Sequence, residues 1–363
     1  MSTLITIDLD ALEANYGLCR ELMQPASCAA VVKADAYGLG FRKIAPVLRH
    51  AGCRQFFTAT HREGVTLRAL LPDVEIYVFE GITALSLATF CDHDLIPVLI
   101  SPAHSALWAK QARELGHPLP AIIHIDTGMT RLGLGEDELH ELLESAEDLD
   151  WLDIRYIMTH FACADEPGAS TSREQLERFN TLRQLLPPAP TSIGNSAGGL
   201  LGGDFSGDMA RVGIALYGGN PYQDDMPPLK PVLRVQSRIL QLREISAGTT
   251  VGYGATYRAK SKTCIATVGT GYADGYPWSL GNHGIAAIGG HRVPVVGRVS
   301  MDLITLDVTG IPADLVQPGC MVDLIGPDIS LEEVAERAGT INYEILTRLG
   351  QRARRKFLGG STS

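Results

Sequence analysis

Short apolar runs alternate with longer amphipathic stretches through the first two-thirds of the chain. Eight of the runs are strand-like: residues 28–33, 55–60, 75–80, 95–100, 121–126, 154–160, 191–195 and 210–218. Between most of them, apolar residues recur with a spacing near 3.6, as in EDELHELLESAEDL and SREQLERFNTLRQLL, which indicates helices. The apolar runs are continuous rather than alternating, which is typical of parallel strands buried on both faces.

The number of strands favours one architecture. Eight strands with intervening helices in roughly 220 residues match an α/β fold of the (β/α)8 TIM-type barrel. An open, doubly wound sheet is the structural alternative, but the glycine-rich turn that should follow its first strand is absent, since residues 38–40 are GLG after a tyrosine. We therefore predict a barrel over residues 1–228.

The pattern changes after a segment rich in Gly, Pro and Asp, GGNPYQDDMPPLKP at 218–231, which indicates a linker. The following segments are short, β-branched and interrupted by glycine, for example CIATVG, RVPVVGRV and LITLDVTG. One helical pattern, SLEEVAERAG, and a basic end, LTRLGQRARRKFL, complete the chain. We predict a β-rich C-terminal domain over residues 229–363.

Composition narrows the partners and the compartment. The net charge is −10 with no stripe dense in Lys and Arg, so nucleic acid and anionic membranes are poor partners. The apolar runs are too short to span a bilayer, and the N-terminus does not resemble a signal peptide. Seven scattered cysteines without a CxxC pair indicate free thiols in a reducing compartment rather than a disulfide framework or a zinc site. A cytoplasmic protein without a metal is the expectation.

Polar residues stand where the predicted strands end or begin. They are Lys33, Arg131, His160, Asn195, Ser196 and Arg211. In a barrel, functional groups gather at the carboxyl ends of the strands and in the loops that follow them. Each residue alone is unremarkable, but together they favour a functional site at one mouth of the barrel.

The residue types suggest the chemistry of that site. Lys33 ends an apolar strand with no acidic cluster beside it, which is typical of a Schiff-base lysine whose pKa falls on desolvation. Gly213 in RVGIALYG and Ser196 before AGG could bring backbone amides and a hydroxyl close to a phosphate. An aldehyde-binding lysine with a phosphate site describes pyridoxal 5'-phosphate. Class I-type aldolases share this logic without the cofactor and stay open on spacing alone.

Nine motifs then carry a specific resemblance. VVKADAYGLG, DTGMTRLGL, MTHFACAD, NSAG, RVGIALYG, VGYGATY, GYADGYP, GRVSMD and INYEILT follow one another from residue 31 to 347. This series, in this order, resembles the bacterial alanine racemase family. The resemblance implies interconversion of L-alanine and D-alanine on pyridoxal phosphate, a homodimer with shared active sites, and supply of D-alanine for peptidoglycan or catabolism of alanine.

The resemblance also implies two catalytic bases. Lys33 corresponds to the lysine that forms a Schiff base with the cofactor and serves as one base, and Tyr253 corresponds to the second base, contributed by the partner subunit. Racemisation removes a proton from one face of a planar carbanion and returns one to the other, so each face needs its own group. Lysine and tyrosine have reference pKa values of about 10, and cationic or dipolar surroundings would suit both to work near neutral pH.

Other matching positions imply contacts to cofactor and substrate. Arg211 corresponds to the arginine that faces the pyridine nitrogen, which an arginine leaves unprotonated, and His160 to the histidine linking it toward the second base. Phosphate contacts correspond to Tyr37, Ser196, Gly213, Ile214 and Tyr343. Arg131 and the backbone of Met301, with Asp302 beside it, correspond to positions that hold the substrate carboxylate. Tyr272 and Tyr343 match tyrosines that narrow the access route, which favours small substrates.

One position departs from the family pattern. Many members have a lysine, often carbamylated, seven residues before the arginine of GMxRLG, and this chain has His124 there. Histidine cannot form that carbamate, so a fixed negative partner for Arg131 is missing. We hypothesise that Asp126, a bound anion or His124 itself orients Arg131.

Four other functions stay open on the sequence. A serine or broad-specificity amino-acid racemase keeps the chemistry and changes the substrate. A pyridoxal-phosphate homeostasis protein resembles the barrel alone, and a decarboxylase on a related two-domain barrel should lack the VGYGATY context. A barrel used only for binding or support would leave the nine ordered motifs unexplained.

Overall fold

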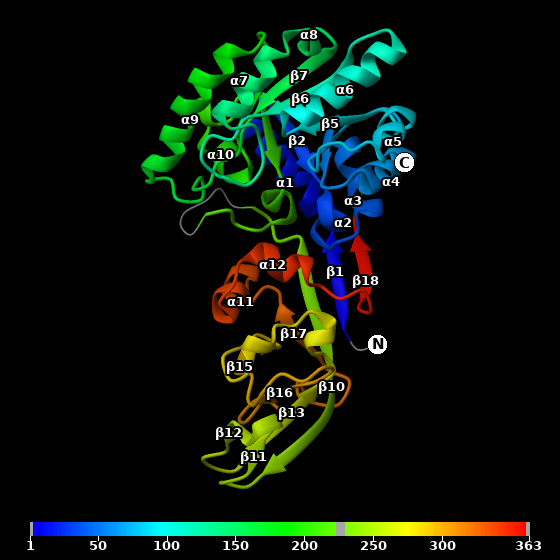
Figure 1. Ribbon diagram of the computed structural model, residues 1–363. Helices are drawn as coiled ribbons and strands as arrows, with labels where there is room; N and C mark the ends of the chain where they lie inside the picture. Colours follow the sequence, from blue (N-terminus) through cyan, green and yellow to red (C-terminus); the bar gives the residue numbers. More distant parts are fainter. Residues whose placement is uncertain (1–2, 223–228, 361–363) are drawn as a thin grey trace.

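The chain folds into a barrel and a β-rich second domain that extends away from it (Figure 1). The computed structural model describes residues 3–222 and 229–360. The predicted fold class is confirmed, because eight parallel strands form one sheet and the C-terminal strands form another. Within the described residues, no helix is long and apolar enough to cross a membrane.

The eight barrel strands begin within two residues of the predicted starts. They are β2 (Ser27–Val31), β3 (Gln55–Thr58), β4 (Glu75–Val78), β5 (Leu95–Leu99), β6 (Leu119–His124), β7 (Leu152–Met158), β8 (Thr191–Ser192) and β9 (Met209–Val212). Their order in the sheet is β8-β7-β6-β5-β4-β3-β2-β9. Backbone hydrogen bonds from Arg211 N to Gly194 O (2.8 Å) and from Asp208 N to Thr191 O (2.9 Å) join β8 to β9. These two bonds close the barrel between its last two strands, of which β8 has only two residues.

Helices surround this sheet, as the amphipathic stretches predicted. They are α1 (Leu9–Leu22), α2 (Lys33–Tyr37), α3 (Phe41–His50), α4 (His61–Leu70), α5 (Leu87–Asp92), α6 (Pro102–Leu115), α7 (Glu136–Glu144), α8 (Ala146–Leu149), α9 (Ser170–Leu182) and α10 (Ser196–Leu201), with short 3-10 turns η1 (Arg183–Leu185), η2 (Gly203–Phe205) and η3 (Ile214–Tyr217). Local signals set several ends. Ser101 caps the first turn of α6 and Gly116 ends it in a left-handed conformation.

The second domain contains the short strands that the sequence predicted. They are β10 (Leu233–Ile245), β11 (Thr250–Val251), β12 (Tyr257–Arg258), β13 (Thr263–Val268), β14 (Ile285–Ile288), β15 (His291–Pro294), β16 (Ile304–Asp307), β17 (Met321–Ile325) and β18 (Arg354–Leu358), with helices α11 (Leu331–Ala338) and α12 (Asn342–Thr347) and turns η4 (Tyr253–Ala255), η5 (Tyr272–Asp274) and η6 (Trp278–Leu280). The long strand β10 leaves the barrel side and pairs with β1, β13 and β17.

The first strand of the chain lies in this second sheet. β1 (Leu4–Asp8) pairs antiparallel with β10 and parallel with β18. Its residues alternate between half-buried and buried, so one face covers the core of the C-terminal sheet. The predicted first domain included these residues because they precede the barrel in sequence. The predicted boundary at 228 and 229 adjoins residues 223–228, outside the described residues, and the division stays a prediction.

Asn15 of α1 ties the barrel to the segment that enters β10. Its side chain is 1 % exposed. Nδ2 donates to Lys230 O at 2.9 Å and to Leu216 O at 3.3 Å, and Oδ1 accepts from Lys230 N at 2.8 Å. One amide side chain therefore satisfies backbone groups of both η3 and the connection between the two sheets.

We expect Asn15→Ala to lower the free energy of unfolding by about 2–4 kcal/mol, since the buried Leu216 O and the part-buried backbone groups of Lys230 would lose their partner. The midpoint of urea unfolding measures this loss. Asn180→Ala is the control, because Asn180 accepts only one hydrogen bond, from Arg183 of the adjoining turn. Equal midpoints for the two variants would contradict the assignment.

Candidate active site

Four barrel strands bring the predicted polar residues to one end of the sheet. Lys33 follows β2, His160 follows β7, and Ser196 begins α10 after β8. Arg211 lies in β9, and Gly213 and Ile214 come directly after it. These six residues span positions 33 to 214 of the sequence, and the fold brings them together at one mouth of the barrel.

Arg211 is a buried cation held by backbone oxygens. It is 2 % exposed. Nη1 donates to the carbonyl and hydroxyl oxygens of Ser192, both at 2.8 Å, and Nη2 donates to Thr159 O at 2.8 Å and Ile193 O at 3.1 Å. Burial lowers the pKa of Arg211 to about 9, so it stays positive at neutral pH. The Nε–H has no hydrogen bond to another described residue, which leaves it for a ligand.

His160 is held as a neutral imidazole by this arginine. Its Nδ1 lies 3.2 Å from Arg211 Nη2, and because a guanidinium can only donate, Nδ1 is the acceptor. Nε2 must then carry the proton. Burial, followed by the positive charges of Arg211 and Arg131, lowers the His160 pKa well below its usual value. His160 is thus a neutral donor at its outer nitrogen.

Lys33 lies in the same positive surroundings. Its Nζ is 5.6 Å from the centre of the Phe79 ring. Burial is the largest cause that lowers the Lys33 pKa, the charges of Arg131 and Arg211 act in the same direction, and Glu63 opposes them. A lysine with a lowered pKa presents more of the neutral amine that attacks carbonyl groups.

The backbone after Lys33 makes a left-handed turn. Residues 34–37 have φ between 52° and 56°, although none is glycine. Such a conformation costs about 1–2 kcal/mol per residue, so outside contacts must hold it. Phe41 N donates to Asp35 Oδ1 at 2.9 Å, and Arg355 of β18 donates to Gly38 O at 2.9 Å. Strain of this kind clusters at functional sites.

Gly213, Ser196 and Tyr37 lie together at the mouth, and Tyr37 leaves no room for a side chain on Gly213. Gly213 N donates to Ser196 Oγ at 2.9 Å. A Cβ on Gly213 would overlap the Tyr37 hydroxyl. The Tyr37 ring packs 4.8 Å from that of Tyr217 and 6.1 Å from that of Tyr343. Burial raises the pKa of Tyr37, and that of Tyr343 to about 12, so both hydroxyls stay protonated donors. These groups suit a phosphate, and with Lys33 and the Arg211 Nε–H they fit pyridoxal phosphate.

Arg131 lies free at this mouth. It is exposed, and its guanidinium has no hydrogen bond or ion pair with another described residue. Asp126, proposed as a partner, instead accepts from the amides of Gly128, Met129 and Thr130 at 3.0–3.1 Å. His124 is 8 % exposed at the end of β6, and burial lowers its pKa to about 3. A neutral His124 is no anionic partner, so of the three candidates a bound anion fits the free Arg131 best.

Tyr343 of α12 packs at this mouth, but the other predicted residues of the second domain lie elsewhere in the same chain. Tyr253 belongs to η4, between β11 and β12 at the end of the second domain far from the barrel (Figure 1). It is 72 % exposed, Met301 is 53 % exposed and Tyr272 is 45 % exposed. Asp302 pairs with Arg352 at 2.5 Å. The chain by itself therefore contains the Lys33 half of the predicted site and a separate Tyr253 half.

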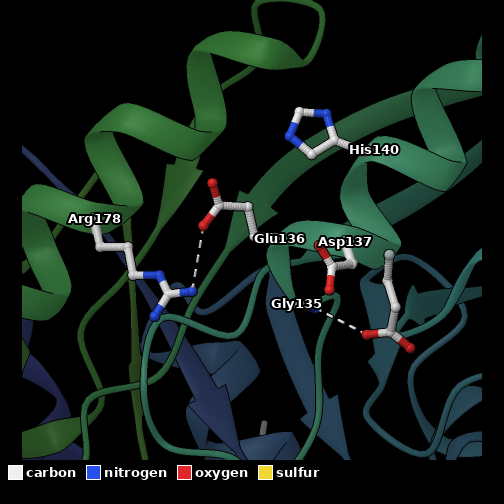
Figure 2. Close-up of a pocket in the computed structure, with 6 residues that line it drawn as sticks. Gly135, Glu136, Asp137, His140 and Arg178 are labelled. Carbon is white, nitrogen blue, oxygen red and sulfur yellow. Dashed lines mark hydrogen bonds and ion pairs between the residues drawn. The ribbon is translucent and has the colours of Figure 1, made fainter.

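A hollow of about 500 Å³ lies away from this mouth, at the start of α7, and Figure 2 shows the residues around it. It is lined by Gly135, Glu136, Asp137, Glu138, His140 and Arg178. Carboxylates dominate it, and the one arginine pairs with Glu136 at 3.7 Å. None of the predicted site residues lines it, and its charge disfavours a phosphate.

Sequence reasoning missed Glu63, whose side chain contacts the backbone next to Lys33. Glu63 Oε1 accepts from Ala34 N at 2.8 Å. The signal in the sequence was the capping-box pattern THRE at 60–63, which predicts a helix start but not a contact to another strand. The backbone oxygens of Thr159 and Ile193 that hold Arg211 were missed too, because carbonyl groups leave no trace in residue types.

Two family models and a set of known proteins match this chain over nearly all of its length. The family model described as "Alanine racemase, N-terminal domain" matches residues 7–221, and "Alanine racemase, C-terminal domain" matches residues 232–357. The alanine racemase of Rhodospirillum rubrum is 46 % identical over 360 residues, covering 99 % of this chain and 96 % of that protein.

Solved structures of alanine racemases resemble this chain in fold as well. Alanine racemase from Bartonella henselae with covalently bound pyridoxal phosphate superposes with a TM-score of 0.95 at 40 % identity, covering 99 % of this chain and 100 % of the other. The biosynthetic alanine racemase of Pseudomonas aeruginosa superposes with a TM-score of 0.91 at 33 % identity, covering 99 % of both chains.

The buried His124 should make stability depend on pH. An unfolded histidine takes up a proton near pH 6.5, whereas folding lowers the His124 pKa to about 3. Between these values the unfolded chain binds more protons, so stability falls as the pH is lowered from about 6.5 toward 3. His124→Gln should reduce this slope by up to about 1.4 kcal/mol per pH unit. Urea unfolding at several pH values measures it.

His140→Gln, at an exposed position of α7, is the control for that experiment. An unchanged slope in His124→Gln would mean that His124 is charged in the folded protein. The half-buried His160 has a pKa lowered in the same direction, so part of the wild-type slope should remain in the variant.

Proposed function

Because this chain belongs to the alanine racemase family, we propose that it is an amino-acid racemase that interconverts L-alanine and D-alanine with pyridoxal 5'-phosphate. The observation that carries this proposal is the barrel mouth, where the amine of Lys33 lies in the positive field of the buried Arg211. The relative from Bartonella henselae, with its covalently bound pyridoxal phosphate, supports the choice of cofactor.

Each part of the mouth suits one part of that cofactor. When bound, pyridoxal phosphate supplies an aldehyde for an amine and a ring that spreads the negative charge of a deprotonated α-carbon. Lys33 provides the amine, and the phosphate contacts are Tyr37, Ser196, Gly213, Ile214 and Tyr343. Arg211 would hold the ring through its Nε–H, the one donor of its guanidinium that has no partner among the described residues. Since its pKa of about 9 keeps it protonated at neutral pH, it donates a hydrogen bond without giving up the proton.

Two bases would act from opposite faces of the substrate. Lys33, whose pKa is lowered by burial, takes or returns the proton at one face. Tyr253 of the partner subunit does so at the other. Its exposure of 72 % and its distance from the barrel mouth in one chain support a shared site rather than an internal one. Each proton removed by one base is replaced by the other, which inverts the α-carbon.

The substrate end of the site would use both subunits as well. Arg131, exposed and without a partner among the described residues, binds the carboxylate together with the backbone of Met301. Tyr272 and Tyr343 narrow the access route, so small side chains such as that of alanine are preferred. Supply of D-alanine for peptidoglycan by a cytoplasmic homodimer is part of this proposal. The second candidate is a serine or broad-specificity racemase, because His124 stands near Arg131 where many family members have a lysine, and Arg131 is at the substrate end.

Loss of circular dichroism from L-alanine tests the activity, with L-serine run alongside. We expect L-alanine to racemise with the higher kcat/KM. Preference for serine would keep the mechanism and change the substrate. If neither amino acid racemises while pyridoxal phosphate still attaches to Lys33, the chain is a pyridoxal-phosphate protein of another function.

Mixed subunits test the shared site. Lys33→Ala and Tyr253→Phe homodimers should each be nearly inactive. A mixed dimer of the two variants contains one site with both Lys33 and Tyr253, so unfolding and refolding them together should restore roughly a quarter of wild-type activity. Refolding each variant alone is the control. No recovery on mixing, with dimers present, would place Lys33 and Tyr253 outside a common site.

A further inference from the structure

Glu63 connects the turn after Lys33 to the neighbouring strand. It is the third residue of α4, and its side chain closes a capping box with Thr60. Oε2 accepts from Ala59 N at 2.8 Å and from Thr60 N at 3.3 Å. Oε1 accepts from Ala34 N at 2.8 Å. One carboxylate thus binds the chain three residues after β2 and immediately after β3.

The bond to Ala34 is made at a strained point. Ala34 is the first residue of the left-handed turn and has φ 52° and ψ 47°. The amide that Glu63 holds is the one next to Lys33, so the hydrogen bond fixes the peptide plane from which the lysine side chain departs. The turn has bonds of its own farther along, from Gly38 N to Ala34 O (2.8 Å) and from Gly40 N to Asp35 O (2.9 Å). These bonds, and the one from Ala36 N to Val32 O (2.9 Å), use other groups of the turn, whereas the Ala34 amide donates to Glu63.

Glu63 also acts on Lys33 by its charge. The charged groups near Lys33 come from several elements: Arg131 from the loop after β6, Arg211 from β9 and Glu63 from α4. The two arginines favour the neutral amine, and Glu63 favours the ammonium ion. His160, at the end of β7, is itself affected by the Lys33 charge, and burial keeps it neutral. Glu63 is therefore the carboxylate that balances a cationic site.

We propose that Glu63 is a positioning residue for Lys33, holding the Lys33–Ala34 peptide through Ala34 N so that the ε-amine faces the barrel mouth. Its consequence for racemisation rests on the function proposed above, but its effect on Lys33 does not. An ordinary capping glutamate would stabilise α4 and leave Lys33 unchanged.

The chain offers a matched control for this distinction. Glu138 is the third residue of α7, and its Oε2 accepts from the N-cap amide, Gly135 N, at 2.9 Å, as Glu63 does from Thr60 N, although Gly135 has no side chain to complete a capping box. It lies on another helix of the same barrel, in the hollow of Figure 2. Glu63→Gln and Glu138→Gln remove the same charge at the same helix position, and only the first removes it beside Lys33.

The first readout is the reactivity of Lys33 itself. In the full-length protein freed of cofactor, the rate at which acetic anhydride acetylates Lys33 is followed by mass spectrometry across a range of pH. Glu63→Gln should move the midpoint of this profile to lower pH, because the ammonium ion loses a favourable charge. Glu138→Gln should not move it. Glu63→Asp keeps the charge but is one methylene too short to reach Ala34 N, so its midpoint should stay near that of the wild type.

The second readout is catalysis. In Glu63→Asp, which cannot reach Ala34 N, kcat for L-alanine should fall by about 10- to 100-fold, since a displaced reacting group costs about this much. In Glu63→Gln the single amide oxygen cannot serve both Ala34 N and the amides of Ala59 and Thr60, so kcat should fall as well. KM should change less, because Arg131 and Met301 are untouched. Glu138→Gln should keep both constants, and the thermal midpoints of all variants report the capping loss separately.

The outcomes separate the two proposals. If Glu63→Gln matches Glu138→Gln in the Lys33 profile and in kcat, Glu63 is only a helix cap and the inference is wrong. If Glu63→Gln does not fold, Glu63→Asp decides the same question through kcat. If the wild type does not racemise alanine, the proposed function fails, while the acetylation profile still decides whether Glu63 acts on Lys33.

Discussion

The burial of the Arg211 guanidinium is the constraint on which the site depends. A cation with 2 % exposure and no carboxylate among its hydrogen-bond partners is stable only if oxygens surround it. The carbonyl groups of Thr159, Ser192 and Ile193 do so, and they come from the ends of β7 and β8. The barrel must therefore close with these strand ends in register, because a shift would leave the charge unpaired.

This buried charge explains the state of its neighbours. His160 must accept a hydrogen bond from Arg211 and cannot be protonated at Nδ1. The pKa of Lys33 falls by burial and by the same positive field, and that of His124 falls to about 3. A mouth with two arginines and neutral histidines attracts anions, which suits a phosphate at one end and a carboxylate at the other. The negative charge of Glu63 opposes the two arginines and raises the pKa of Lys33.

The second domain is joined to the barrel mouth by more than the linker. β1 begins the chain in the C-terminal sheet, Asn15 holds the entrance to β10, and Arg355 of β18 donates to the turn after Lys33. These contacts set the orientation of the second domain, and that domain leaves Tyr253 and Met301 exposed. The exposure of these two residues, which the proposed function places in the active site, is explained if a second copy completes each site.

The sequence by itself determined the eight barrel strands, because a parallel strand buried on both faces must be apolar along its length. It also determined which residue types stand at strand ends, so Lys33, His160, Ser196 and Arg211 could be selected before their positions in space were known. It did not assign β1, whose partners β10 and β18 are more than 220 residues away. The contact of Glu63 with Ala34 and the carbonyl groups around Arg211 were decided only by the tertiary structure. The reason is physical: periodicity records which side of an element is buried, whereas a hydrogen bond to a distant backbone group depends on how the elements pack, and the chain carries no local pattern for it.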